Sequence, residues 1–291
     1  MKPAAFDYHA PATAEEAVAL ISELGDEAKF IAGGQSLMPM LNLRLAVFEH
    51  LVDLRRVHTL RGIGVRGDSV WIGAGTTHST VGRSEQVRSA VPLLSRATPL
   101  IGHFQIRNRG TIGGSIAHAD GAGEYPAVAL TLDAEIETLS PGGTRTIPAS
   151  QFFTGMWSTD LAEDELITGI TFPVAPARSG YATEEFTRRS GDFAVAGALV
   201  ALTLAEDSTI ERCAITTFGL GPTATRATVV EQAVTGAVAA EQDPETVARD
   251  VLDGVESISE DLHGPVEYRK RVGTAMVARA WQRAVEEATH G

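Results

Sequence analysis

Residues 29–36 are Lys-Phe-Ile-Ala-Gly-Gly-Gln-Ser, a short apolar run that passes directly into two glycines. The run 29–32 predicts a β-strand, because aromatic and β-branched residues favour the extended backbone. Glycine has no Cβ atom and tolerates positive φ, so Gly33 and Gly34 predict a sharp turn that a ligand can approach closely. Successive N–H groups in such a turn form a concave anion site. Residues 32–36 are therefore a candidate phosphate-binding loop.

The residues around this loop predict a small β-α-β unit. Upstream, Thr13 is a good helix N-cap, Glu16 stands three residues later as in a capping box, and Gly25 is a suitable C-cap. Downstream, residues 51–54 predict a second short strand. Leu37 begins an apolar stretch, and we expect its packing against the rest of the protein to hold the loop in place.

A second stretch follows the same plan further along the chain. Residues 111–115 are Thr-Ile-Gly-Gly-Ser, with Arg107 and Arg109 just upstream to add positive charge. Neither glycine pair has the Gly-x-Gly-x-x-Gly spacing of a dinucleotide-binding fold or the Gly-Lys-Ser/Thr ending of a P-loop. A lone Gly-Gly pair is most often only a tight turn. Spacing by itself therefore supports no more than a nucleotide-binding α/β protein.

The rest of the chain predicts further strands, helices and one domain boundary. Residues 173–179 hold two prolines and small residues, as in a linker. We expect a first domain over 1–176, with subdomains of about 1–57 and 58–176, and a second over 177–291. Strands are expected at 63–65, 70–74, 134–139, 144–148, 165–172, 181–188, 195–204 and 211–218. Helices are expected at 80–87, 90–97, 224–235, 244–254 and 265–288, with an apolar buried stretch at 126–132.

Composition excludes several classes of protein. The net charge of −13 disfavours a basic face for nucleic acid. One cysteine, Cys213, can form neither an internal disulfide nor an iron–sulfur cluster. No apolar run approaches the ~18 residues of a membrane span, and the first residues do not resemble a signal peptide. We therefore expect a cytoplasmic protein.

Five segments, in chain order, resemble the flavoprotein (medium) subunits of molybdenum hydroxylases, which include carbon monoxide dehydrogenase medium chains and the flavin part of xanthine dehydrogenase. Residues 31–37 resemble the first FAD motif of that family and residues 106–120 the second. The resemblance continues at 132–135, 188–194 and 263–271. It implies an α+β fold: an FAD-binding domain of two α/β subdomains (vanillyl-alcohol-oxidase or PCMH type), then a C-terminal domain with a three-stranded antiparallel sheet and a helical bundle.

The resemblance also implies which residues bind FAD. Asp120 would accept hydrogen bonds from the ribityl or adenosine part, and Ile101 would lie near the isoalloxazine ring. Arg188 and Phe193 would reach the open side of the ring from the C-terminal domain. The pyrophosphate and ribityl regions would lie on the two glycine segments. The implied residues of these segments are Ala32, Gly33, Gly34, Gln35, Ser36, Leu37, Thr111, Gly113, Gly114, Ser115 and Ala117.

The chain departs from its relatives at three of these positions. Glu124 stands where Asp is common, so the resemblance leaves its contact with FAD open, and we keep it in the expected binding set. Ser115 replaces the Asn of some relatives and keeps a polar group. Phe193 replaces Tyr and keeps the ring but loses the phenol, so we expect no hydrogen bond there.

No catalytic residue and no metal site is expected. His78, His103 and His118 do not stand at metal-ligand spacing, and we expect His118 to support loop geometry. Trp157 is expected in the core, as are most tryptophans. The run that begins at Arg269 is expected on a solvated helix face.

These observations lead to one main hypothesis about function. The chain would be an oxidoreductase subunit that takes electrons onto FAD from the [2Fe-2S] clusters of a small partner subunit and passes them to an external acceptor. A large partner subunit with a molybdenum cofactor would oxidise the substrate, in a heterohexamer of the (αβγ)2 type. The alternatives are a free-standing FAD-dependent oxidoreductase and a non-catalytic assembly protein. The substrate and the acceptor cannot be inferred from this chain.

Overall fold

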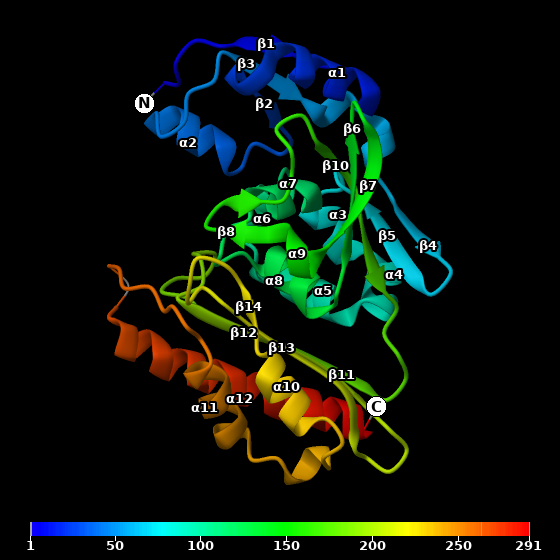
Figure 1. The fold of residues 1–291 in the computed structure, drawn as a ribbon, viewed down its shortest axis with the longest axis vertical. Helices are drawn as coiled ribbons and strands as arrows, with labels where there is room; N and C mark the ends of the chain where they lie inside the picture. Colours follow the sequence, from blue (N-terminus) through cyan, green and yellow to red (C-terminus); the bar gives the residue numbers. More distant parts are fainter. Residues whose placement is uncertain (1, 263, 291) are drawn as a thin grey trace.

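The computed structural model describes residues 2–262 and 264–290. Met1, Gly291 and His263, the first residue of the 263–271 segment, lie outside the described residues. Three units follow one another along the long axis of the molecule, each built on its own β-sheet (Figure 1). The N-terminal unit lies at one end and the C-terminal helices lie at the other.

The N-terminal unit is a parallel sheet in the order β1-β3-β2, as the predicted β-α-β unit requires. Its elements are β1 (Asp7–His9), α1 (Ala14–Leu24), η1 (Gly25–Glu27), β2 (Ala28–Ile31), α2 (Leu37–Leu43) and β3 (His50–Asp53). The capping box is confirmed, since the Thr13 hydroxyl accepts from the Glu16 N–H at 3.1 Å. The buried face of α1 covers the sheet with Ala17, Val18 and Ile21.

The middle unit pairs an antiparallel sheet, in the order β4-β5-β10-β6-β7, with a group of short helices. Its strands are β4 (Ile63–Arg66), β5 (Ser69–Gly73), β6 (Glu135–Ser140), β7 (Gly143–Pro148) and β10 (Leu166–Pro173), with a hairpin of β8 (Phe153–Gly155) and β9 (Ser158–Thr159). Its helices are α3 (His78–Arg83), α4 (Glu85–Ala90), α5 (Pro92–Ala97), α6 (Phe104–Arg107), α7 (Ile112–His118), α8 (Glu124–Thr131) and α9 (Ala149–Phe152). Short 3-10 turns join them: η2 (Leu54–Arg56), η3 (His58–Leu60) and η4 (Thr98–Leu100).

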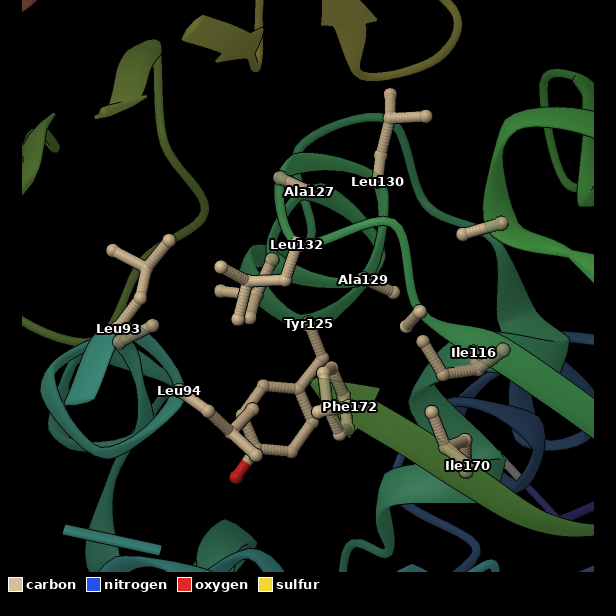
Figure 2. Close-up of a cluster of buried hydrophobic side chains, with 14 of the residues drawn as sticks. Leu93, Leu94, Ile116, Tyr125, Ala127, Ala129, Leu130, Leu132, Ile170 and Phe172 are labelled. Carbon is tan, nitrogen blue, oxygen red and sulfur yellow. The ribbon is translucent and has the colours of Figure 1, made fainter. Parts of the chain in front are cut away.

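Two features of this unit differ from or extend the sequence expectations. The helix expected over 80–87 is broken at Ser84, because the Ser84 hydroxyl accepts from the Val87 N–H and starts α4 as a new helix. The apolar stretch 126–132 is confirmed as buried, and every residue of α8 is buried. Figure 2 shows the ring of Tyr125 from α8 lying among Leu94 and Phe172. A helix that is buried on all sides carries apolar residues all round.

The C-terminal unit is an antiparallel sheet in the order β11-β12-β13-β14, covered on one face by helices. Its elements are β11 (Ser179–Phe186), β12 (Ala196–Leu204), β13 (Ile210–Phe218), β14 (Thr225–Arg226), α10 (Thr228–Val234), η5 (Ala239–Glu241), α11 (Pro244–Asp253) and α12 (Val266–His290). The three expected strands are present, and the two-residue β14 makes a fourth that is too short for a sequence signal. A Cβ atom on Gly180 would lie 1.8 Å from the carbonyl oxygen of Ala284, so this glycine lets α12 press against β11.

Arg269 on α12 corrects one expectation. It was expected on a solvated face, but it is only 4% exposed. Its guanidinium donates to the carbonyl oxygens of Val195 at 3.1 Å and Gly219 at 2.6 Å, and to the Asp261 carboxylate at 2.5 Å. A buried charge needs such partners, and here they anchor α12 to the ends of two strands. Among the residues that the structure describes, no helix combines the length and the apolar composition that a bilayer crossing requires.

Polar contacts join the C-terminal unit to the middle unit. Arg96 on α5 donates to both carboxylate oxygens of Glu287 on α12, at 2.6 Å each, and to the carbonyl oxygen of Tyr181. The Glu287 carboxylate also accepts from the Tyr181 N–H at 2.9 Å. Close to the cavity described below, the Gly219 N–H donates to the Gly121 carbonyl at 2.8 Å. Apolar residues of both units form one continuous cluster beneath these contacts.

Replacing Arg96 tests the strength of this junction. We expect Arg96→Met to lower the free energy of unfolding by about 1–2 kcal/mol, because it removes a bidentate bond to a charged group that is only partly exposed. Urea unfolding followed by circular dichroism measures this. The control is Arg88→Met, which removes an exposed pair with Glu85 at 3.0 Å and should cost less than about 0.5 kcal/mol. Equal losses in the two variants would contradict a special role for Arg96.

Candidate cofactor-binding site

A cavity of about 1200 Å³ lies between the N-terminal and middle units, and residues 191–193 of the C-terminal unit contribute to its lining. Fifteen expected binding residues line it. They are Ala32, Gly33, Gly34, Gln35, Ser36, Leu37, Ile101, Thr111, Gly113, Gly114, Ser115, Ala117, Asp120, Glu124 and Phe193. The exception is Arg188, an exposed residue in the turn after β11 that is absent from the lining. Phe193 is 63% exposed, which suits a residue at the rim.

The two glycine segments meet at this cavity. A Cβ atom on Gly33 would lie 2.2 Å from the carbonyl oxygen of Arg109, which no side chain could tolerate. A Cβ atom on Gly114 would lie 3.6 Å from that of Ala32. The missing side chains therefore let two stretches that are far apart in sequence touch backbone to backbone. This close approach brings residues 32–36 and 111–115 to one wall.

The first glycine segment has the donors of an anion site. Gly34 has φ +72°, which glycine adopts without strain. Among the described residues, the backbone N–H groups of Gly33, Gly34, Gln35 and Ser36 donate to no other group of the chain. The Gln35 side chain instead steadies the turn by donating to the Gly33 carbonyl at 3.1 Å. Consecutive free donors at a cavity wall suit a phosphate.

The second glycine segment does not repeat this plan. It is the first turn of α7, with Thr111 as N-cap, and the amide groups of residues 112–115 already have acceptors within the chain. Ile112 donates to Thr76, Gly113 to Ala74 at 2.9 Å, Gly114 to the Thr111 hydroxyl at 3.1 Å and Ser115 to the Thr111 carbonyl at 3.0 Å. The bonds of Ile112 and Gly113 tie the helix to the segment after β5. The expectation of a second nest of free N–H groups is therefore wrong.

A Trp-His-Asp group borders the cavity beyond α7. Trp157 was expected in the core, but it is 60% exposed, has φ +53° and lies in the turn between β8 and β9. Its ring stacks on His118, and its indole N–H donates to the Asp120 carboxylate at 3.3 Å. The other Asp120 oxygen accepts from the Ala122 N–H at 2.9 Å. Asp120 thus holds its own turn as well as facing the cavity.

Glu124 is a buried carboxyl group at the start of α8. It is 7% exposed and lines the cavity. Burial, together with the nearby negative charges of Glu185 and Asp120, raises the pKa of Glu124 to about 8. At neutral pH its carboxyl group is mostly neutral, so it can donate a hydrogen bond as well as accept one.

Several lining residues were not expected from the sequence. They are Thr77, His78, Trp157, Leu161 and Asp192. Thr77 and His78 follow the predicted strand 70–74, and polar residues directly after a strand were the one signal that could have identified them. The others come from a hairpin turn and a loop, whose position depends on how the units dock.

The cavity suits a ligand with an anionic part and apolar rings. Free amide donors lie on one segment, while apolar side chains come from the N-terminal unit (Ile21 and Phe30) and from Leu60, Ile101 and Phe193 elsewhere. A dinucleotide with a pyrophosphate and two ring systems, such as FAD, has this chemistry.

The raised pKa of Glu124 predicts a dependence of stability on pH. The unfolded chain loses the Glu124 proton near pH 4.5 while the folded chain keeps it up to about pH 8, so stability falls as pH rises through this window. We expect Glu124→Gln to remove this loss and to exceed the wild type in stability by about 1 kcal/mol or more at the alkaline end. Thermal unfolding of the flavin-free protein across this pH range measures it. The control is Glu211→Gln, because Glu211 is exposed. If stability falls with pH equally in the wild type and in Glu124→Gln, the prediction is contradicted.

Two family models match the chain almost end to end. The FAD binding domain in molybdopterin dehydrogenase matches residues 4–175. The CO dehydrogenase flavoprotein C-terminal domain matches residues 181–284.

Full-length relatives agree with these matches. The 6-hydroxypseudooxynicotine dehydrogenase complex subunit alpha of Paenarthrobacter nicotinovorans is 39% identical, over 99% of this chain and 97% of the relative. The carbon monoxide dehydrogenase medium chain of Hydrogenophaga pseudoflava is 38% identical, over 96% of this chain and 97% of the relative.

Solved structures show the same fold. A chain of carbon monoxide dehydrogenase from Hydrogenophaga pseudoflava, in a form that lacks the Mo-pyranopterin moiety, superposes with a TM-score of 0.94 at 39% identity over 99% of both chains. A chain of quinoline 2-oxidoreductase from Pseudomonas putida 86 gives 0.93 at 32% identity, again over 99% of both. The protein therefore belongs to the FAD-binding medium subunits of the molybdenum hydroxylase family, which are flavoprotein subunits of oxidoreductases.

Proposed function

We propose that this chain holds FAD in the cavity between its N-terminal and middle units and relays electrons through it. The observation that carries the proposal is the set of unbonded backbone N–H groups of Gly33 to Ser36. They are packed close to the Thr111–Ser115 turn, and the family of this chain binds FAD. The pyrophosphate lies on these two segments, and the isoalloxazine ring lies toward Ile101 and Phe193. Arg188 is exposed and outside the lining, so it reaches the ring only after a movement of its turn.

The electrons come from a partner subunit and leave to an external acceptor. One cysteine is too few to ligate a [2Fe-2S] cluster, so the clusters belong to a separate small subunit. Relatives are named as a medium chain and as a subunit of a dehydrogenase complex, which supports partner chains for this protein as well. The partners are a large molybdenum-cofactor subunit and a small [2Fe-2S] subunit in an (αβγ)2 heterohexamer in the cytoplasm.

The residues of this chain bind and orient the cofactor. When bound, FAD supplies reversible redox chemistry that accepts electrons singly or in pairs. The Gly33–Ser36 amides and the Ser115 hydroxyl donate hydrogen bonds that stabilise the negative charge of the pyrophosphate and position it. Glu124, neutral at physiological pH, offers a hydrogen bond without adding negative charge beside the phosphates. The Gly219–Gly121 bond holds the turn of Asp120 in place from the C-terminal unit.

The chain divides functionally into an FAD-binding part, residues 1–176 with subdomains of about 1–57 and 58–176, and a covering part, residues 177–291. The continuous apolar cluster across the junction, which includes Leu199 and Phe218 of the covering part, supports stable docking of the two. Docking keeps Phe193 at the rim of the cavity.

Substitution of Gly33 tests the site. In Gly33→Ala, a methyl group would lie 2.2 Å from the Arg109 carbonyl and force the two segments apart, so we expect FAD affinity to fall by about tenfold or more. Flavin absorbance per chain and titration of the flavin-free protein measure it. In the control Gly142→Ala the methyl makes an ordinary contact, 3.5 Å from the Ser140 hydroxyl oxygen, and this variant should bind FAD normally. A wild-type protein that neither contains flavin nor takes it up would overturn the proposed site.

Native mass spectrometry of the complex from its own cells tests the partners. We expect two copies each of this chain, a molybdenum-cofactor chain and a [2Fe-2S] chain. A flavin-loaded chain that is isolated alone and oxidises a substrate itself would indicate a free-standing oxidoreductase. Partner binding without flavin would indicate an assembly protein.

A further inference from the structure

His78 is a buried histidine behind the second glycine segment, and the binding scheme above gives it no role. It is 3% exposed and lies at the start of α3, after the segment 74–77, whose Ala74 and Thr76 carbonyls accept from α7. Its backbone N–H donates to the Gly110 carbonyl at 3.0 Å. Its imidazole Nε2 lies 3.0 Å from the Thr111 carbonyl oxygen and 3.1 Å from the Ser115 hydroxyl.

The Thr111 contact determines which ring nitrogen of His78 carries the proton. A carbonyl oxygen can only accept, so Nε2 must be the protonated nitrogen and must donate to Thr111. The Ser115 oxygen then lies within reach of the same N–H as a second acceptor. The other nitrogen, Nδ1, is buried without a hydrogen-bond partner among the described residues. An unpartnered lone pair is tolerated there more readily than an unpartnered N–H donor.

This tautomer has a consequence for Ser115. If Nε2 carried a lone pair, the Ser115 hydroxyl would donate to it and its hydrogen would be used up inside the protein. With Nε2 protonated, the Ser115 oxygen accepts and its hydrogen stays free. The amides of Ile112, Gly113, Gly114 and Ser115 are already bonded within the chain, so this hydroxyl and the donors of Thr111 are what the second segment can offer to a ligand.

We propose that His78 is a positioning residue for FAD: its Nε2–H holds the Ser115 oxygen and thereby leaves the Ser115 hydroxyl free to donate to a pyrophosphate oxygen. The inference rests on the proposed placement of the pyrophosphate on residues 111–115. It assigns to His78 an indirect role, through Ser115, and no contact with the cofactor.

The surroundings of His78 keep it neutral and in place. Burial, with a smaller contribution from the positive charge of Arg107, lowers the pKa of His78 to about 4, so the ring is neutral at physiological pH. The Tyr125 ring meets it edge to face at 4.9 Å, and the Tyr125 hydroxyl is itself bonded to Thr98 at 2.8 Å. A Cβ atom on Gly110 would lie 3.1 Å from Nδ1, so the ring fits closely against the chain.

A double-mutant cycle on the full chain tests the coupling between His78 and Ser115. Flavin-free His78→Phe, Ser115→Ala and the double variant are titrated with FAD, with His58→Phe as the control because His58 is exposed. We expect each single variant to weaken FAD binding by about tenfold or more, the range for a hydrogen bond to a charged group. The double variant should bind no more weakly than Ser115→Ala alone, because His78 acts through Ser115. His78→Gln, whose amide can still donate from the position of Nε2, should bind close to the wild type.

Nitrogen NMR of 15N-histidine-labelled wild-type protein tests the tautomer without any variant, so a His78→Phe chain that fails to fold does not leave the question open. We expect the His78 resonances to show a protonated Nε2 and an unprotonated Nδ1, assigned from their loss in His78→Gln. A protonated Nδ1, or additive losses in the double variant, would overturn the inference while leaving the FAD site intact. A wild-type chain that does not bind FAD would instead overturn the proposed function.

Discussion

The close contact between Gly33 and the Arg109 carbonyl is the constraint on which the site depends. The Gly33 loop ends a strand of the N-terminal unit, while Arg109 precedes the first turn of a helix in the middle unit. A single methyl group at Gly33 would separate them. Because side chains are absent at this point, one unit can supply free amides and the other a capped helix turn to the same cavity wall. The two halves of the cofactor site are therefore held together by backbone packing.

The remaining structure keeps this contact enclosed. The Ile112 and Gly113 amides at the start of α7 donate to the carbonyls of Thr76 and Ala74, and these bonds hold the helix against the segment after β5. The C-terminal unit is fastened to the middle unit by the Arg96–Glu287 pair, and it reaches the cavity through the Gly219–Gly121 bond and through Phe193. Two titratable groups of the cavity lining, Glu124 and His78, are driven by burial toward their neutral forms. At these two positions the wall offers neutral hydrogen-bonding groups to an anion, with no added negative charge.

Local chemistry in the sequence predicted much of the architecture. The Thr13–Glu16 capping box, the parallel pairing around the first glycine loop, the buried stretch 126–132 and the long strands of the C-terminal sheet were all visible, because each is encoded by neighbouring residues. The predictions were wrong where a side chain makes its contacts with residues that are far away in the sequence. Arg269 looks like a surface cation until Val195, Gly219 and Asp261 surround it. Trp157 looks like a core residue until its turn is seen at the cavity, stacked on His118.

The two glycine segments show the same division between what local sequence determines and what distant contacts determine. The sequence by itself determined that residues 32–36 and 111–115 are turns with room for a ligand, since glycine acts on its own backbone, and that they belong to a flavoprotein family. Only the tertiary structure decided that they are unlike each other. The first keeps its amides free because none of the described residues reaches them, whereas in the second the amides of residues 112–115 are taken up by Ala74, Thr76 and Thr111. Which donors remain for a ligand depends on which acceptors the folded chain brings near, and that is a property of contacts between segments far apart in sequence.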